Sequence, residues 1–407
     1  MKSPGCWEFL FPVVIGANRR RHHACAAGSL AVYWRSLQLQ RAGAMNQEAA
    51  PRLGMFVMPV HDPNKPLAQC LDEDLELAVK CEELGFDDFW VGEHHSSTYE
   101  NISMPEMFLA RVLGETSTIR VGPAPVCLPY HHPAHVAGRL AFLDHLSHGR
   151  LNVCFGPGAI PTDMEMFGID PKDMGPRVVE SINMILKLWS EDPPIDLDGD
   201  FWSIHLSENL DGEMGLGSLH RPLQKPHPPI YTPCIRRDSV GVRKAAARGF
   251  RPFSHHMIGN EVLRSHWQMY TEGCRDGGHE PDPSHWSISR NIFVADTTEE
   301  ALAQARSNSL GRCIEYIIEL TRRSGDLDLW KRTPDQGDDE LTIDYFLDEV
   351  IIAGDPAEVT RQLRELREAI GAFGTLVLVA HDFDDKASWL HSLDLFANEV
   401  VPALGAS

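Results

Sequence analysis

Long apolar runs are missing from this sequence. No stretch approaches the roughly 18 consecutive apolar residues that a helix needs to cross a bilayer. A Cys-x-x-Cys pair is also missing, and the nine cysteines are scattered over 407 residues without the density of a disulfide scaffold. These absences exclude a helical membrane protein and a small secreted disulfide-rich domain. They lead us to expect reduced thiols in a cytoplasmic protein.

Basic residues are also relatively few. Lys and Arg number 37 against 58 Asp and Glu, which gives a formal net charge of -21. A surplus of acid repels phosphate backbones and anionic membrane surfaces, so we predict neither nucleic acid nor a membrane as a partner. The sequence has no Rossmann glycine fingerprint and no P-loop, which argues against tight binding of a nicotinamide or of ATP.

The segment before Met45 differs from the rest because it is basic and nearly free of acidic residues. Its short apolar part, Trp7–Ala17, is followed rather than preceded by positive charge at Arg19–Arg21, which is the wrong order for a signal peptide. Two interpretations stay open: a mitochondrial-type address, or an over-extended reading frame whose natural start is Met45. We favour the second and expect residues 1–52 to lie outside the fold, with 53–407 forming one domain.

Short apolar runs alternate with longer amphipathic stretches from Leu53 onward. This pattern is typical of repeated βα units around a parallel sheet, and the length suits a TIM-type (β/α)₈ barrel with two insertions. We predict strands at Leu53–Pro59, Phe86–Val91, Arg120–Val126, Leu151–Phe155, Ile230–Cys234, Phe250–Phe253, Ser287–Val294 and Thr375–Ala380. We predict helices at Leu71–Leu84, Pro105–Glu115, Pro133–Leu146, Arg177–Trp189, Ser239–Arg248, Glu261–Arg275, Ala357–Ala369 and Ser388–Val401.

The two predicted insertions have little periodicity. Residues 191–229 are rich in proline, glycine and acids, and as a long barrel loop they are expected to shape the pocket. Residues 323–349 are polar and acidic but are punctuated by Trp330, Tyr345 and Phe346. The second insertion is interpreted either as an ordered flap or as a plain mobile surface loop.

A histidine pair follows the second predicted strand, in the stretch GEHHSST. The active site of a (β/α)₈ barrel lies at the C-terminal ends of its strands, so His94 and His95 are candidate site residues. Histidine donates one hydrogen bond, accepts another and exchanges a proton near neutral pH. Because adjacent side chains point in different directions, we expect at most one of the two to face the cavity. A purely structural role for the pair is the alternative.

A zinc site is a second interpretation of the histidines. His131, His132 and His135 could combine with Glu93 and His94 on paper. The spacing fits no motif that carries a mechanism, and His-Glu-x-x-His is absent. We therefore predict that no metal is bound, with the histidines before the helix simply lining a loop.

A candidate phosphate site opens the fifth predicted helix, in the stretch IRRDSVGVRKAAARG. A phosphate needs backbone N–H donors at a helix N-terminus, a hydroxyl and preferably an arginine. Ser239, Arg236 and Arg237 supply the last two. The alternative is that Asp238 or Ser239 only caps the helix and that both arginines are solvated surface charges.

Several segments together resemble the flavin-dependent luciferase-like monooxygenases. They are WVGEHHSS at Trp90–Ser97, the long run Arg120–Pro171, and Arg177 with Glu180. The long run is similar to the limonene 1,2-monooxygenase branch. The resemblance covers Leu53–Leu404 and is densest in the first half.

The resemblance implies a two-component monooxygenase. Reduced FMN or FAD would come from a separate flavin reductase and react with O₂, and the hydroperoxyflavin would oxidise a small hydrophobic substrate, terpene-like or aliphatic. It also implies a homodimer that pairs the helices Pro105–Glu115 and Pro133–Leu146 with their copies.

By position in the family, His94 matches the active-site histidine and Ser239 the serine of the phosphate-binding helix. We expect Glu93 to support His94 from the strand end. Tyr130, at the same barrel face, is expected to contact the flavin. The other expected cofactor contacts are Gly156, Gly158, Arg236 and Arg237.

One departure from the luciferase catalytic subunit stands at the end of the fourth strand. That subunit carries a cysteine beside the flavin and an arginine for its phosphate, whereas this chain has Gly156 and Pro157. Luminescence is therefore in doubt, and the phosphate must rely on Ser239 with Arg236 or Arg237.

Two other functions remain as alternatives. An oxidoreductase on the same fold could use deazaflavin F420, which cannot form the oxygen adduct, so a cofactor titration separates the two. A flavin-binding protein without turnover is the second alternative. His94, Tyr130 and Ser239, all chemically competent and expected at one barrel face, argue against it.

Overall fold

The computed structural model describes residues 50–58 and 60–405, and our expectations for residues 1–49 lie outside this part. The first strand begins at Arg52, one residue before the predicted Leu53. No helix in these two ranges is long and apolar enough to span a membrane.

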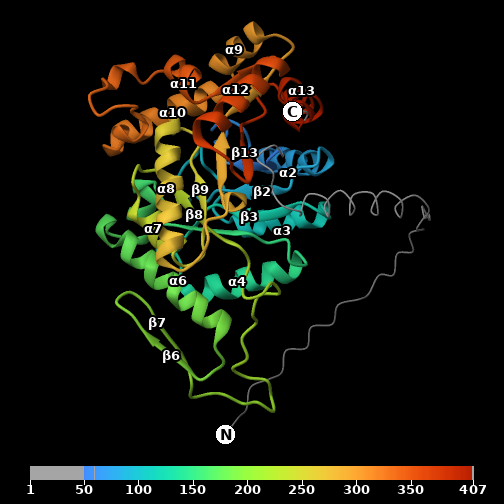
Figure 1. Cartoon of the computed structure of the whole chain (residues 1–407). Helices are drawn as coiled ribbons and strands as arrows, with labels where there is room; N and C mark the ends of the chain where they lie inside the picture. Colours follow the sequence, from blue (N-terminus) through green and yellow to red (C-terminus); the bar gives the residue numbers. More distant parts are fainter. Residues whose placement is uncertain (1–49, 59, 406–407) are drawn as a thin grey trace, which may run out of the picture. The chain divides into compact units, whose positions relative to one another are not determined.

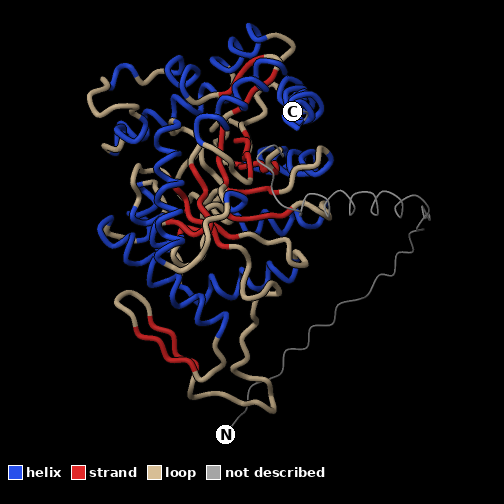
Figure 2. The backbone as a smooth tube through the Cα atoms, viewed as in Figure 1, coloured by secondary structure: helices blue, strands red, loops and turns tan. Residues whose placement is uncertain are grey.

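A closed barrel of parallel strands forms the centre of the fold (Figure 2). Neighbouring strands pair in chain order, the last strand pairs with the first, and a bridge between Val121 and Leu151 closes the remaining gap. Its strands are β1 (Arg52–Val57), β2 (Asp88–Val91), β3 (Arg120–Pro123), β5 (Val153–Gly156), β8 (Ile230–Cys234), β9 (Arg251–Ser254), β10 (Ser287–Arg290) and β13 (Thr375–Ala380). A two-residue strand, β4 (Val126–Cys127), extends this sheet beside β5. The predicted (β/α)₈ barrel is confirmed.

Alternate residues of the strands face the barrel interior, where aromatic rings fill the space. The ring of Trp90 lies 4.9 Å from that of Tyr231 and 5.2 Å from that of Phe253, both edge to face. A Cβ atom on Gly122 would lie 2.5 Å from the Trp90 ring, so only glycine fits beside this indole. The barrel is thus a packed core, and ligands are expected at its rim.

Helices surround the strands (Figure 1). Proline at the first turn marks the starts of α3 and α4, and both helices have the predicted bounds. The helices of the barrel units are α2 (Leu67–Glu83), α3 (Pro105–Glu115), α4 (Pro133–Leu146), α6 (Met174–Ser190), α7 (Val240–Ala246), α8 (Asn260–Asp276), α12 (Pro356–Ile370) and α13 (Lys386–Leu395). A π-helical turn (Phe396–Val400) and α14 (Val401–Gly405) continue α13 to the C-terminus.

The seventh unit departs from the prediction. The expected strand Ser287–Val294 is interrupted at Asn291, and its second half, β11 (Ile292–Val294), pairs in parallel with β12 (Ile352–Gly354) outside the barrel. Between β11 and β12 lie three helices that the sequence analysis did not predict: α9 (Thr298–Ser307), α10 (Ser309–Ser324) and α11 (Ile343–Glu349).

Both predicted insertions contain regular structure. Residues 191–229 include a hairpin of β6 (Ile195–Asp198) and β7 (Ser203–Leu206). The second insertion includes the short 3₁₀ helix η4 (Leu327–Trp330) and α11, and it buries Trp330 and Phe346. This favours the ordered flap over the mobile loop. In Figure 1 the hairpin lies on the side of α4 and α6, and α9–α12 lie at the opposite side of the barrel.

Candidate functional site

His94 sits between two buried carboxylates just beyond the end of β2. Its Nε2 lies 2.9 Å from Oε2 of Glu100, and its Nδ1 lies 3.6 Å from Oδ2 of Asp163. Burial alone lowers the pKa of His94, but the two carboxylates outweigh burial and raise the pKa to about 10. A pKa in this range does not support the expected proton exchange near neutral pH. His94 is an imidazolium at pH 7 and acts as a hydrogen-bond donor.

Both carboxylates are held by further hydrogen bonds. Asp163, on α5 (Pro161–Phe167), accepts hydrogen bonds from the backbone N–H of His95, at 3.2 Å to each oxygen, and from the Ser96 hydroxyl. Glu100 accepts a hydrogen bond of 2.8 Å from the Tyr316 hydroxyl on α10. Helix α10, which leads into the second insertion, therefore reaches the His94 centre directly.

Glu93 is a buried carboxylate that joins two other histidines. Its Oε1 accepts from Nε2 of His95 at 2.8 Å and from Nε2 of His131 at 2.6 Å, and its Oε2 accepts from the backbone N–H of Cys127 at 3.1 Å. Burial raises the pKa of Glu93, but these hydrogen bonds outweigh it and bring the pKa to about 2. The expectation that Glu93 supports His94 is wrong, because its carboxylate is committed to His95 and His131.

The zinc site that was considered as an alternative does not form as a set. Donor atoms of Glu93, His95 and His131 lie within 4.8 Å of one another. Hydrogen bonds account for this cluster, since Glu93 accepts one from each ring. His132 is elsewhere engaged and caps α4 by accepting from a backbone N–H.

Tyr130 and two glycines lie close together after β4 and at the end of β5. The Tyr130 ring stacks on Phe167 with centroids 5.0 Å apart, and its buried hydroxyl has no hydrogen-bond partner among the described residues. A Cβ on Gly158, which has a φ of +84°, would lie 2.4 Å from that hydroxyl, and one on Gly156 would lie 2.7 Å from Pro125. Glycine is therefore required at these turns, and an unpaired donor remains available beside them.

The candidate phosphate residues lie at the start of α7. Ser239 caps this helix by accepting from a backbone N–H at 3.4 Å. The Arg236 side chain is 68% exposed and pairs with Asp326 at 2.7 Å, and that of Arg237 is 46% exposed and pairs with Glu261 at 3.0 Å. In this structure both guanidinium groups are thus engaged by surface acids.

A polar cluster that the sequence analysis missed lies at the ends of β9, β10 and β13. Asn291 links His256 and His381, with its Nδ2 2.8 Å from His256 Nδ1 and its Oδ1 3.0 Å from His381 Nε2. Burial lowers the pKa of His255 to about 4 and that of His381 to about 3, so both are neutral. Trp330 of η4 stacks on His255 at 5.2 Å. The signal was available in the sequence, because these histidines directly follow the sixth and eighth predicted strands.

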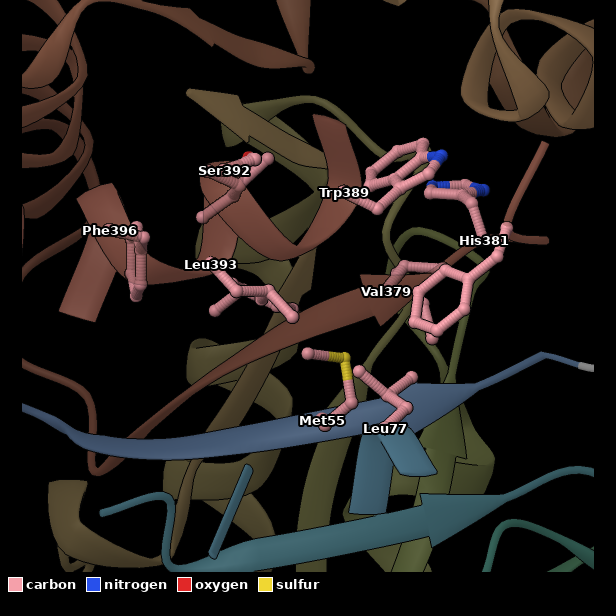
Figure 3. A pocket seen from close by; sticks show the side chains of 12 residues that line it. Met55, Leu77, Val379, His381, Trp389, Ser392, Leu393 and Phe396 are labelled. Atoms are coloured by element: carbon pink, nitrogen blue, oxygen red, sulfur yellow. The ribbon is translucent and has the colours of Figure 1, made fainter. Parts of the chain in front are cut away.

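A small, largely apolar cavity of about 20 Å³ lies beside this cluster (Figure 3). Met55 and Leu77 line it from β1 and α2, and Trp389 and Leu393 line it from α13. His381 stands at its margin. The cavity lies between the barrel wall and α13, outside the His94 centre, so we do not assign it to the reaction.

Comparisons with known proteins agree with this architecture. The family model described as luciferase-like monooxygenase matches residues 51–372. The chain is 31% identical to 3,6-diketocamphane 1,6-monooxygenase of Pseudomonas putida, covering 87% of this chain and 98% of that protein. It is 29% identical to limonene 1,2-monooxygenase of Rhodococcus erythropolis, covering 86% and 85%.

A solved structure extends the agreement to three dimensions. The oxygenating constituent of 3,6-diketocamphane monooxygenase from Pseudomonas putida, in complex with FMN, superposes with a TM-score of 0.79 at 32% identity, covering 87% of this chain and 98% of that one. The predicted resemblance is confirmed over most of the chain. This protein belongs to the luciferase-like monooxygenase family and is a flavin-dependent monooxygenase.

Proposed function

We propose that the enzyme takes reduced FMN from a separate reductase and uses O₂ to oxygenate a compact alicyclic, terpene-like substrate. The observation that carries the proposal is the His94 centre, where a fixed positive charge stands at the rim of a (β/α)₈ barrel of this family. The relatives support the substrate class, since their names refer to diketocamphane and limonene, and one is called an oxygenating constituent.

The residues after β4 and β5 fit a flavin. When bound, the reduced flavin supplies the reaction with O₂, and the protein supplies orientation and electrostatics. The unpaired Tyr130 hydroxyl offers a hydrogen bond, and Gly156 and Gly158 give Pro125 and the Tyr130 ring the room to pack against the backbone there. The phosphate is assigned to the N-terminus of α7, with Ser239 and with Arg236 after it releases Asp326.

His94 is assigned the role of proton and hydrogen-bond donor. An imidazolium stabilises negative charge that develops on oxygen, and it cannot serve as a general base while protonated. Glu93 acts on the site indirectly, because it holds the rings of His95 and His131 in place. Glu93 is thus a positioning residue.

Helix α10 and η4, at the start of the second insertion, are assigned the role of a roof over the reaction. Tyr316 bonds to Glu100, and Trp330 covers His255, so α10 and η4 close the barrel rim on this side. A roof of this kind excludes water from the oxygen chemistry and shapes the substrate chamber.

A homodimer through α3 and α4 completes the proposal. Large apolar side chains stand exposed on these helices, with Met107 at 75%, Phe142 at 63% and Leu146 at 47% exposure. Such a concentration on two neighbouring helices suits a protein interface. We also propose a cytoplasmic location, which the seven free cysteines of the described residues support.

Stopped-flow spectroscopy tests the proposal. The full chain is mixed anaerobically with photoreduced FMN, FAD or F420 and then with oxygen, with and without an alicyclic ketone. We expect FMN to reoxidise more slowly on the enzyme than in free solution and the ketone to be converted to an oxygenated product. Immediate reoxidation without product contradicts the proposal, and turnover with F420 alone favours the dehydrogenase alternative.

A further inference from the structure

Arg290 is a buried cation without a counter-ion. Its side chain, at the end of β10, is 1% exposed, and it donates to the carbonyl oxygen of Ser289 at 3.0 Å and to Oδ1 of Asn260 at 3.4 Å. Both acceptors are neutral, and within the described ranges no carboxylate forms an ion pair with it. Burial lowers the pKa of Arg290 to about 10, so the group stays charged at pH 7. A buried unpaired guanidinium costs free energy unless an anion joins it.

His256 offers an unused hydrogen-bond donor nearby. The residue is 0% exposed, and the side-chain amide nitrogen of Asn291 lies 2.8 Å from its Nδ1. An amide nitrogen can only donate, so Nδ1 accepts and the ring proton is on Nε2. That Nε2 is buried and has no hydrogen-bond partner in the described chain. His256 follows β9 and Arg290 ends β10, two strands that pair in parallel, and Asn291, next to Arg290, bonds to His256, so the two groups lie at neighbouring strand ends.

The N-terminus of α8 adds a third favourable group. This helix has 17 residues, and its N-cap, Gly259, supplies no side-chain cap. Asn260, in its first turn, is the residue that touches Arg290. Glu261 does not neutralise this end, because its half-exposed side chain pairs with Arg237 instead. A helix N-terminus favours a negative charge, and here it stands beside a buried positive one.

We propose that Arg290, Nε2 of His256 and the N-terminus of α8 bind the carboxylate of an organic substrate. The cluster lies at a different helix end from the N-terminus of α7, to which the flavin phosphate is assigned, and Arg237 before α7 pairs with Glu261 in the first turn of α8. Helix α10 connects the cluster to the reaction centre, because Tyr316 of this helix bonds to Glu100 and Thr321 bonds to Trp330, whose ring stacks on His255. The assignment rests on the proposed function in that the rest of the substrate is taken to occupy the chamber beside His94.

The charge of the site selects a carboxylate over a neutral carbonyl. A ketone oxygen would satisfy the His256 donor but would leave the guanidinium charge uncompensated in a buried setting. A carboxylate provides two acceptor oxygens and a full negative charge, which matches the forked donors of arginine. Ligand access requires movement of η4, because Trp330 covers His255 above this corner.

Binding measurements without flavin or oxygen test the site. The full chain is titrated calorimetrically with adamantane carboxylate, a rigid alicyclic acid, and with the neutral adamantane carboxamide. We expect the carboxylate to bind tighter than the amide and Arg290→Met to weaken the carboxylate by about 10- to 100-fold, the usual worth of hydrogen bonds to a charged group. Arg361→Met, which removes an exposed arginine of α12 that is paired with surface acids, is the matched control and should change neither affinity.

Melting temperatures give a second readout. Because the guanidinium is unpaired without a ligand, Arg290→Met should melt at or above the wild-type temperature in buffer and gain less stability from the carboxylate. Arg290→Lys keeps the positive charge but not the paired N–H donors of the guanidinium group, so it should bind the carboxylate with intermediate affinity. This variant replaces Arg290→Met in the test if the methionine variant does not fold. Equal wild-type affinities for acid and amide, or an unaltered carboxylate affinity in Arg290→Met, would overturn the proposal.

Comparing the affinities for FMN and for riboflavin, which lacks the phosphate, distinguishes the two anions that the site could bind, the flavin phosphate and a substrate carboxylate. If Arg290→Met abolishes a preference for FMN over riboflavin and leaves carboxylate binding unchanged, the anion that this site binds is the flavin phosphate. The assignment to a substrate carboxylate is then wrong. If the FMN preference is unchanged and carboxylate binding is lost, the assignment stands. Because these titrations need no turnover, a failure of the proposed oxygenation leaves their result interpretable.

Discussion

The Nε2 atom of His94 and the Oε2 atom of Glu100 lie 2.9 Å apart, and this ion pair fixes a positive charge at the barrel rim. Asp163 supports the same ring from its other nitrogen at 3.6 Å. Three charged groups in a largely buried setting are costly unless they pair, so their geometry is expected to be well defined. The reaction is thereby provided with a donor whose protonation does not change around neutral pH.

Replacing His94 tests its role in oxygen transfer. In His94→Gln we expect oxygenation to slow by about 10²–10⁴-fold and hydrogen peroxide to be released instead of product, because one positioned proton donor is lost. Stability should also fall, by about 3–5 kcal/mol, since Glu100 and Asp163 lose their counter-ion. Product and peroxide are measured together against flavin consumed.

His95→Gln is the matched control for that experiment. His95 bonds to Glu93 and its ring contacts Phe167 at 4.9 Å, so its loss should lower the melting temperature while coupling stays near normal. Full coupling in His94→Gln, or a swapped pattern between the two variants, contradicts the assignment.

The stability of the protein should depend on pH through His94. Its pKa is raised from 6.5 in the unfolded chain to about 10 in the fold. The stabilisation is therefore complete below pH 6.5 and is lost as the pH rises through about 10. Melting temperatures of the wild type and His94→Gln, compared from pH 6 to pH 10.5, should converge at the alkaline end. A constant difference would show that His94 is not held as an imidazolium.

The hydrogen bond from Tyr316 to Glu100 connects α10, which leads into the second insertion, to the site. Tyr316→Phe should cost about 1–3 kcal/mol, because a donor to a buried carboxylate is removed. Peroxide release should also increase, since Glu100 holds His94. Tyr99→Phe is a close control, because the Tyr99 ring stacks on Tyr316 at 4.8 Å and that stacking remains. Equal effects of the two substitutions would assign the contact to packing alone.

Local patterns predicted the barrel well because its units carry clear boundaries. Helices α3 and α4 start at prolines, and β8 and β13 are apolar runs of strand length, so all four were predicted to the residue. The run Ser287–Val294 was misread as one strand, because the exit at Asn291 depends on pairing between β11 and β12, which are distant in sequence. Helix α10 was overlooked although its buried residues recur at helical spacing.

The site was only partly predictable for a related reason. The strand-end rule identified His94, but its partner Asp163 comes from α5 and the support of Glu100 comes from Tyr316 on α10. Such contacts join separate units of the barrel and leave no local pattern. Glu93 was expected to contact His94 because the two residues are adjacent in sequence. Adjacent side chains point in different directions, and Glu93 bonds to His95 instead.

The exposed apolar side chains of α3 and α4 predict a dimer that a single charge can disrupt. Phe142→Glu should shift the protein toward the monomer in light scattering, because an unpaired carboxylate would be buried at the interface. Val240→Glu, at a 61% exposed position on α7, is the control and should leave the assembly unchanged. A wild-type monomer at micromolar concentration contradicts the predicted dimer.

Replacing Gly158 with alanine distinguishes the effect of backbone strain from that of steric contact at the proposed flavin site. An alanine Cβ there would lie 2.4 Å from the Tyr130 hydroxyl, at a φ of +84° that alanine rarely adopts. Gly158→Ala should therefore displace Tyr130 and weaken flavin binding as well as lower the melting temperature. Gly168→Ala is the matched control, because its φ of +66° is also left-handed but nothing lies within 4 Å of the added methyl group. We expect both variants to lose about 1 kcal/mol to strain and only Gly158→Ala to lose flavin affinity in fluorescence titrations. Equal flavin affinities in the two variants would place the flavin away from Tyr130.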